Sequence, residues 1–150
     1  MNSFKEIKPL SNFDIIQKCR ELKIKNFKGV LMRDELKGKA SKSECLILNI
    51  DDSSGNCTHW TSLFSTNGLS YYFDSYGFEP PNEVRQYCSN NENFYNSFKI
   101  QKSDEVICGH YCIYVIYQLN KGMLFYDILD ELYKKSFKIN NHIINDRTKC

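Results

Sequence analysis

Four residues have the side chains that nucleophilic hydrolysis requires, and they occur in the order His59, Asp74, Gln101 and Cys108. An imidazole takes the proton of a thiol, a carboxylate orients the imidazole, and a neutral amide donates a hydrogen bond to the oxyanion formed during attack. Each residue alone carries little information. Together they predict a cysteine hydrolase, provided that the fold brings them into one place.

The first two of these residues are expected to meet at the end of a β-hairpin. His59 opens a predicted strand over 59–65, and Asp74 lies near the end of the next predicted strand, over 69–76. Asn67 and Gly68 between them are typical of a tight hairpin turn. Because antiparallel pairing puts the start of one strand beside the end of the next, we predict that the imidazole and the carboxylate are neighbours.

The nucleophile candidate stands at the start of the most apolar predicted helix, over 108–119. Free backbone N–H groups and the helix dipole stabilise a thiolate at that position, which favours Cys108 as the reactive cysteine. Gly109 leaves room for the backbone of a substrate to approach. Gln101, upstream of the cysteine, supplies the amide donor for the oxyanion.

Structural interpretations of the same residues stay open at this stage. A lone histidine such as His59 is often a structural residue, and Asp74 is able to end a strand by accepting backbone hydrogen bonds in the next turn. Cys108 is able to serve as a buried apolar thiol, as we expect for Cys45 and Cys112. The flexible turn before His59 and the acidic residue on its partner strand favour the functional interpretation.

Two other classes of function are compatible with some of these residues. The segments Cys57-x-His59 and Cys108-x-His110-x-Cys112 contain potential zinc ligands, but structural zinc sites prefer CxxC spacing, so we predict no metal site. A non-catalytic binding module on the same fold is the third class. The presence of all four hydrolase residues argues against it.

The elements that must position these residues can also be predicted. Residues 11–22 indicate a helix capped by Ser11 or Asn12, with Phe13, Ile16 and Leu22 on its buried face, and the apolar run 45–50 indicates a strand covered on both faces. A weak helix near 82–88, a short strand near 95–100 and an amphipathic helix over 124–135 follow. Residues 27–36 are ambiguous, and the tail after residue 140 is expected to be loose. This order predicts an α+β fold in one domain over 1–150.

Composition narrows the class of protein. The chain has 150 residues, 41% hydrophobic and 14% aromatic, which is enough for one packed core. A net charge of +2 does not favour nucleic-acid binding by bulk electrostatics. No apolar run approaches the length of a membrane span, no signal peptide is evident, and the seven cysteines are an odd number, so we predict a soluble intracellular protein with mostly reduced thiols that is not secreted.

The sequence resembles the adenovirus-type (adenain-like) cysteine proteinases, and most of all the proteases of Polinton/Maverick transposons and virophage-like elements. The resemblance runs from about residue 11 to 120 and rests on Asn26-Phe27-Lys28-Gly29-Val30, the segment 45–49, Thr58-His59-Trp60, Tyr72-Phe73-Asp74-Ser75-Tyr76-Gly77-Phe78, Gln101 and Cys108-Gly109-His110-Tyr111-Cys112.

The resemblance implies a papain-like α+β fold with permuted chain order, in which helices flank a central, mostly antiparallel sheet. It makes His59 the general base, Asp74 its orienting carboxylate, Cys108 the nucleophile and Gln101 the oxyanion donor. It also implies that Trp60 packs against the imidazole or shapes the cleft. We therefore name Trp60 and Gly109 as candidate substrate-binding residues.

The same resemblance implies an endopeptidase that cuts capsid or virion precursor proteins near glycine, inside a host cell or packaged in a virion. The related Ulp1/SENP deconjugating peptidases share the order His, Asp, Gln, Cys and a His-Trp pair, and supply the alternative function, cleavage after the C-termini of ubiquitin-like proteins. The viral and transposon branch is favoured by the match around Gly77, Phe78 and Cys112 and by the short chain.

This sequence differs from the adenoviral enzyme in the residues that are linked to activation of that enzyme. The adenoviral enzyme is activated by DNA and by a peptide disulfide-bonded to a cysteine upstream of the oxyanion glutamine. Cys88 lies on the correct side of Gln101, but in a different, polar sequence context. We therefore predict no peptide cofactor, and the modest net charge gives no support for DNA as activator or partner.

Overall fold

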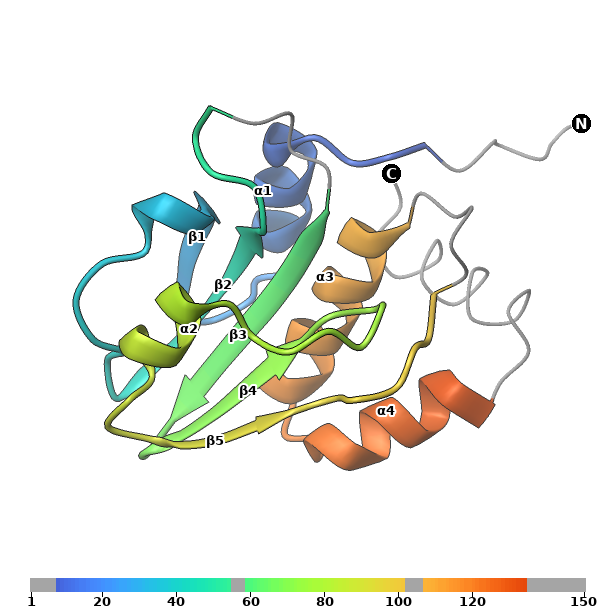
Figure 1. The fold of residues 1–150 in the computed structure, drawn as a ribbon. Coiled ribbons are helices and arrows are strands. Elements are labelled where there is room, and N and C mark those ends of the chain that lie inside the picture. The colour runs from blue at the N-terminus through green and yellow to red at the C-terminus, as the bar shows by residue number, and fades with distance from the viewer. Residues whose placement is uncertain (1–7, 55–58, 102–106, 135–150) are drawn as a thin grey trace, which may run out of the picture.

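The computed structural model describes residues 8–54, 59–101 and 107–134. Its elements confirm the predicted α+β class: a five-stranded sheet flanked by helices (Figure 1). In chain order they are α1 (Asn12–Glu21), β1 (Phe27–Met32), the short 3-10 helix η1 (Arg33–Glu35), β2 (Ser43–Asn49), β3 (Trp60–Thr66), β4 (Leu69–Phe73), α2 (Asn82–Tyr87), β5 (Glu92–Tyr95), α3 (Cys108–Asn120) and α4 (Phe125–Lys134). The predicted loose tail after residue 140 lies outside the described residues.

The five strands lie in the sheet in sequence order, β1-β2-β3-β4-β5. β2–β3 and β3–β4 pair antiparallel, whereas the two edge pairs, β1–β2 and β4–β5, are parallel. The sheet is therefore evenly mixed, where the prediction was a mostly antiparallel one. The connections through η1 and through α2 carry the chain back along the sheet, which parallel pairing of an edge strand requires.

The sheet is covered on both faces. Along β2, Cys45 and Ile47 belong to a core formed with α1, α3 and α4, whereas Leu46 and Leu48 belong to a second core that includes Val84 of α2. Figure 1 shows α1 and α3 behind the sheet and α2 in front of it. This confirms the expectation that the apolar run 45–50 is a strand buried on both sides.

Helix α1 forms where predicted but turns a different face to the core. Ser11 caps it in a capping box with Asp14. The buried residues are Ile15 and Cys19, one turn apart. The predicted buried face was right only in part, because Leu22 packs partly buried against the core whereas Phe13 is 76% exposed. The spacing of Phe13, Ile16 and Leu22 suits a helix, but packing against α3 and β1 selects the neighbouring face.

The predicted hairpin between β3 and β4 is present. Asn67 and Gly68 both have positive φ, 48° and 84°, as the two central residues of a type I′ turn require. Ser62 pairs with Phe73, so the residue before β3 and the residue after β4 lie at the same end of the hairpin.

The strand predicted near 95–100 lies earlier, as β5. Residues 96–101 instead run beside the turn after β4: Ile100 and Gln101 both donate backbone hydrogen bonds to the carbonyl of Ser75. No helix among residues 8–54, 59–101 and 107–134 is long and apolar enough to cross a bilayer.

Candidate active site

The imidazole of His59 and the carboxylate of Asp74 form the centre of the candidate site. Nε2 of His59 lies 2.8 Å from Oδ1 of Asp74, and both residues are buried, at 6% and 1% exposure. The same oxygen accepts the backbone N–H of Tyr76 at 2.8 Å. The hairpin thus brings together the two residues that the sequence predicted as neighbours.

Cys108 is the first residue of α3, as predicted, and is partly buried. Helix α3 packs on β3, and in Figure 1 its first turn lies at the same end of the molecule as the start of β3. The Cys108 thiol lies close enough to the His59 side chain to help raise the pKa of the imidazole. Because Nε2 faces Asp74, Nδ1 is the ring nitrogen available for an interaction with the sulfur.

The surroundings of His59 favour its charged form. Burial lowers the pKa of His59, but the hydrogen bonds and negative charges of Asp74 and Cys108 outweigh it and raise this pKa from 6.5 to about 9. These neighbours therefore stabilise the imidazolium form of the ring. His110 shows the opposite case: burial lowers its pKa to about 4, and neither ring nitrogen has a hydrogen-bond partner among the described residues. Of these two histidines, only His59 lies within hydrogen-bond distance of a carboxylate that stabilises its protonated form.

Gln101 is 1% exposed and lies against the turn that follows Asp74. Its Oε1 accepts a hydrogen bond of 2.5 Å from the Ser75 hydroxyl, and its Nε2 lies 3.5 Å from the hydroxyl oxygen of Tyr76. The backbone N–H of Gln101 donates to the Ser75 carbonyl at 2.9 Å. Hydrogen bonds thus hold Gln101 against the two residues that follow Asp74. The function of Gln101 as oxyanion donor stays a prediction.

Three residues that sequence reasoning did not assign also build the site. The side chain of Asn96 hydrogen-bonds to the backbone N–H and carbonyl of Asp74, Ser75 holds Gln101, and the ring of Tyr76 stacks on the imidazole with centroids 4.6 Å apart. Ser75 and Tyr76 stand inside the motif that carried the family resemblance. Asn96, a single polar residue after an edge strand, gave no signal in the sequence.

The two candidate substrate-binding residues occupy the protein interior. Trp60 is 4% exposed, and its indole N–H donates to the carbonyl of Leu10. A Cβ placed on Gly109 would lie 3.3 Å from the Trp60 ring and 3.5 Å from Ile15, so this glycine allows α3 to pack against Trp60 and α1. The ring stacked on the imidazole is that of Tyr76. Contact of Trp60 or Gly109 with substrate stays a prediction.

The remaining described cysteines differ from Cys108 in exposure. All four are buried, and burial raises the pKa of Cys19 and of Cys45 to about 12 and that of Cys112 well above its usual range. Cys88, considered above as an attachment point for a peptide, is 1% exposed. Within the described ranges, no three His, Cys, Asp or Glu residues are grouped so that they could hold a metal ion.

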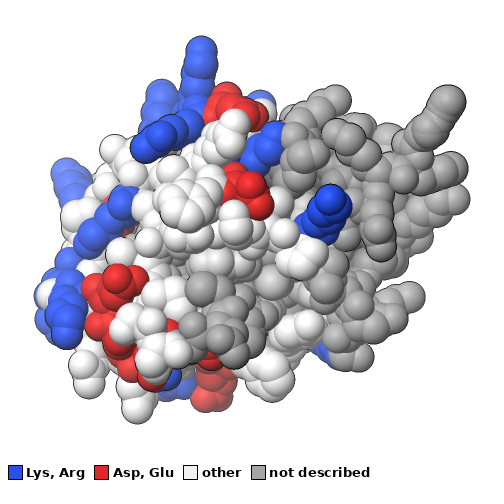
Figure 2. Space-filling view, turned by 90° about the horizontal axis from the view of Figure 1, so that it is seen from above, with Lys and Arg blue, Asp and Glu red and all other residues white. Residues whose placement is uncertain are grey.

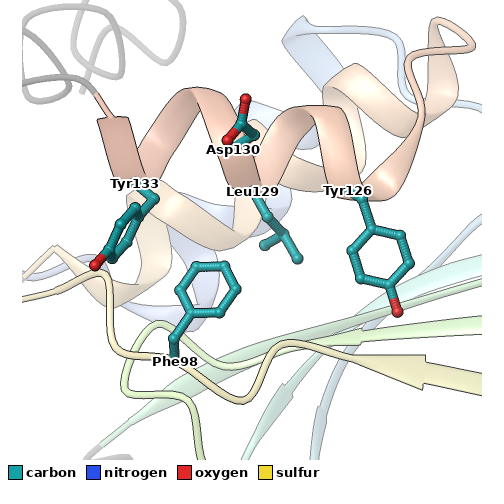
Figure 3. A pocket seen from close by; sticks show the side chains of 5 residues that line it. All are labelled: Phe98, Tyr126, Leu129, Asp130 and Tyr133. Atoms are coloured by element: carbon teal, nitrogen blue, oxygen red, sulfur yellow. The ribbon is translucent and has the colours of Figure 1, made fainter.

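A separate groove of about 440 Å³ lies between α4 and the segment 96–101 (Figure 3). Its lining consists of Phe98, Tyr126, Leu129, Asp130 and Tyr133. None of the predicted catalytic residues lines it. The backbone of Phe98 also packs against Gly77, so one wall of the groove is continuous with the turn that carries the site.

Charge is distributed unevenly over the face seen in Figure 2. The described Lys and Arg side chains form several separate groups with acidic side chains between them, and no continuous basic surface covers the described part of this face. This distribution gives no electrostatic argument for binding a nucleic-acid backbone there.

Comparison with known proteins identifies the fold. No family model and no curated protein matches the sequence. Among solved structures, the chain is similar to the ASFV pS273R protease, with 17% identity, a TM-score of 0.61, and coverage of 84% of this chain and 65% of that one. The selenomethionine form of the same protease gives 17% identity and a TM-score of 0.64, with coverage of 93% and 66%.

A second protein of this fold is the SUMO protease Ulp1, solved with its catalytic cysteine oxidised to a sulfinic acid. It has 11% identity, a TM-score of 0.56, and coverage of 94% of this chain and 75% of that one. The chain therefore has the fold of these proteases, as the sequence predicted. It spans slightly less than two thirds of the ASFV protease chains.

Proposed function

We propose that this chain is a cysteine endopeptidase in which Cys108 attacks a peptide carbonyl. The observation that carries the proposal is the His59 imidazole, which lies 2.8 Å from the Asp74 carboxylate and has its pKa raised by both Asp74 and the Cys108 thiol at the start of a helix. The raised pKa of His59 favours the imidazolium, which is the partner that a thiolate nucleophile requires.

In the first half of the reaction, the Cys108 sulfur forms a bond to the carbonyl carbon, and the carbonyl oxygen becomes an oxyanion. The amide of Gln101 donates a hydrogen bond to this oxygen. The His59 imidazolium then gives its proton to the leaving nitrogen, the carbon–nitrogen bond breaks, and the amine product departs. A thioester between Cys108 and the substrate remains.

In the second half, water attacks the thioester carbon while neutral His59 takes a proton from it. The carbon–sulfur bond breaks, the carboxylic acid product leaves, and the thiolate–imidazolium pair is restored. Asp74 keeps the imidazole in one orientation and stabilises its charged form through both halves.

The substrates that we propose are capsid or virion precursor proteins of a virus, virophage-like element or Polinton-type transposon, cut near glycine. The sequence resemblance to the adenain-like proteinases supports this proposal, and so does the likeness in fold to a protease of ASFV. The enzyme would then act inside the host cell or within the particle. The proposal includes no metal, no peptide cofactor and no DNA activator.

The alternative is a deconjugating peptidase that acts after the C-terminus of a ubiquitin-like protein. The likeness in fold to the SUMO protease Ulp1, over 94% of this chain, favours it. The same residues would perform the same chemistry, with a lysine side-chain amine as the leaving group. Cleavage of SUMO- or ubiquitin-based reporters, with no cleavage of precursor-derived peptides, would select this alternative.

The proposed chemistry is tested with a fluorogenic peptide amide ending in Gly-Gly and with a peptide vinyl sulfone that labels reactive thiols. We expect Cys108→Ala to abolish turnover and labelling, whereas Cys88→Ala, at a cysteine in the second core, retains both. Unchanged turnover by Cys108→Ala would refute the mechanism. An unreactive wild-type thiol would instead support a binding module on this fold.

A further inference from the structure

We propose that Ser75 is a positioning residue that fixes the amide of Gln101 with its N–H groups directed to the oxyanion. This inference rests on the proposed function, and it concerns a residue to which neither the sequence resemblance nor the comparisons give a role. The evidence lies in the hydrogen bonds between two segments that are 26 residues apart in the chain.

Three hydrogen bonds connect Ser75 to the end of the segment 96–101. Its carbonyl accepts the backbone N–H groups of Ile100, at 2.8 Å, and of Gln101, at 2.9 Å. Its hydroxyl donates to Oε1 of Gln101 at 2.5 Å. Ser75 has no exposed surface and Gln101 has 1%, so water does not compete for these bonds.

The hydrogen bond from the Ser75 hydroxyl to Oε1 of Gln101 determines whether the amide presents its donor or its acceptor end to a substrate. A primary amide has an acceptor end and a donor end, and the two are nearly equal in shape. With Oε1 occupied by the Ser75 hydroxyl, Nε2 faces the other way, toward the hydroxyl oxygen of Tyr76 at 3.5 Å. The Tyr76 ring in turn stacks on His59. The donor end thus lies on the side of the catalytic imidazole.

Without the Ser75 hydroxyl, this orientation loses its strongest described determinant. The reversed state of the amide would then lose its main competitor, and in that state the amide would present an oxygen to a developing negative charge. The step that forms the oxyanion would become slower. Formation of the thiolate–imidazolium pair would not change, because the Ser75 hydroxyl donates its hydrogen bond to Gln101 and not to Asp74 or Cys108.

Two reactions separate these effects. Hydrolysis of a Gly-Gly peptide amide passes through an oxyanion, whereas alkylation of Cys108 by iodoacetamide displaces iodide at a saturated carbon and forms none. We expect Ser75→Ala to lower kcat for hydrolysis at least about tenfold, less than Gln101→Ala, since removal of a whole oxyanion donor costs about 10²–10³ in kcat. KM and the alkylation rate stay within twofold of wild type.

A double-mutant cycle tests whether Ser75 acts through Gln101. In a Gln101→Ala background, we expect Ser75→Ala to cause no further loss of kcat. In the otherwise wild-type protein, we expect Ser75→Thr, which keeps a hydroxyl, to retain more activity than Ser75→Ala. Ser70→Ala is the matched control, because Ser70 is also a buried serine with a hydrogen-bonded hydroxyl but lies on β4, where its hydroxyl contacts Ser65 and Asn91.

Several results would overturn the inference: an unchanged kcat in Ser75→Ala, a full additional loss in the Gln101→Ala background, or a parallel loss of alkylation. Thermal unfolding of each variant identifies any loss that comes from the fold. If Cys108→Ala still turns over the peptide, the proposed function itself fails. If Cys108 is essential and Ser75→Ala is neutral, only the inference fails.

Discussion

Asn96 holds the backbone of Asp74 at both of its polar groups. Its Oδ1 accepts the Asp74 N–H at 3.1 Å, and its Nδ2 donates to the Asp74 carbonyl at 2.6 Å. One amide side chain thus takes the place of a strand neighbour just beyond the end of β4. This arrangement fixes the backbone from which the carboxylate reaches His59, while the carboxylate itself stays available to the imidazole.

Replacing this amide should weaken both the fold and the site. We expect Asn96→Ala to lower the free energy of unfolding by about 1–3 kcal/mol, because two buried backbone groups lose their partner. We also expect kcat to fall, because Asp74 is no longer held. Denaturant unfolding and peptide hydrolysis measure the two effects. Asn93→Ala, at an exposed residue whose side chain donates hydrogen bonds to the nearby backbone carbonyls of Cys88 and Asn91, is the control and should change neither.

The pH dependence of hydrolysis follows from the raised pKa of His59. In the proposed mechanism the imidazolium donates the proton to the leaving amine, so we expect kcat/KM to fall on the alkaline side near pH 9. The ring's contribution to folding stability has the same sign: it is complete below about pH 6.5 and is lost as the pH rises through about 9.

Removing the negative charge of Asp74 should shift the alkaline limb of the profile of kcat/KM against pH. We expect Asp74→Asn to shift it to lower pH by about one unit or more, because the nearby negative charge that favours the imidazolium is gone. Profiles of kcat/KM against pH for the two proteins provide the measurement. An alkaline limb that stays near pH 9 in the variant would show that Asp74 does not stabilise the charged ring.

The stacked ring of Tyr76 offers a test of aromatic packing at the site. An aromatic pair contributes about 0.5–1.5 kcal/mol beyond simple burial, so we expect Tyr76→Leu to lower kcat/KM about two- to tenfold. Tyr76→Phe keeps the ring and should retain most of the activity. The backbone N–H that Tyr76 donates to Asp74 is present in both variants. Equal activity of the leucine and phenylalanine variants would argue against any contribution of the stacking.

Gly77 is constrained by both conformation and space. Its φ is +77°, and a Cβ there would lie 2.7 Å from the backbone of Phe98. Gly38 has a similar φ of +84° but open space around it. A non-glycine residue in the left-handed region costs about 1–2 kcal/mol, so both alanine variants should lose stability. We expect Gly77→Ala to lose clearly more, and to lose kcat as well, because the displaced segment leads to Gln101. Equal losses in unfolding experiments would mean that the segment moves aside freely.

The sequence alone determined the local elements and the meeting of His59 with Asp74. A capping serine, an apolar run, an Asn-Gly turn and an apolar helix starting at Cys108 are signals within a few residues of the backbone that they organise. The hairpin register then follows from backbone pairing, and the neighbourhood of the two catalytic candidates follows from that register.

Only the tertiary structure decided how these groups are held. The hold of Asn96 on Asp74 spans 22 residues and that of Ser75 on Gln101 spans 26, and neither pair belongs to a repeating backbone pattern. The buried face of α1 and the parallel edge strands likewise depend on packing between distant segments. Such contacts depend on how side chains fill space and satisfy buried polar groups once the sheet and helices have packed together. The spacing of residues along the chain therefore does not predict them.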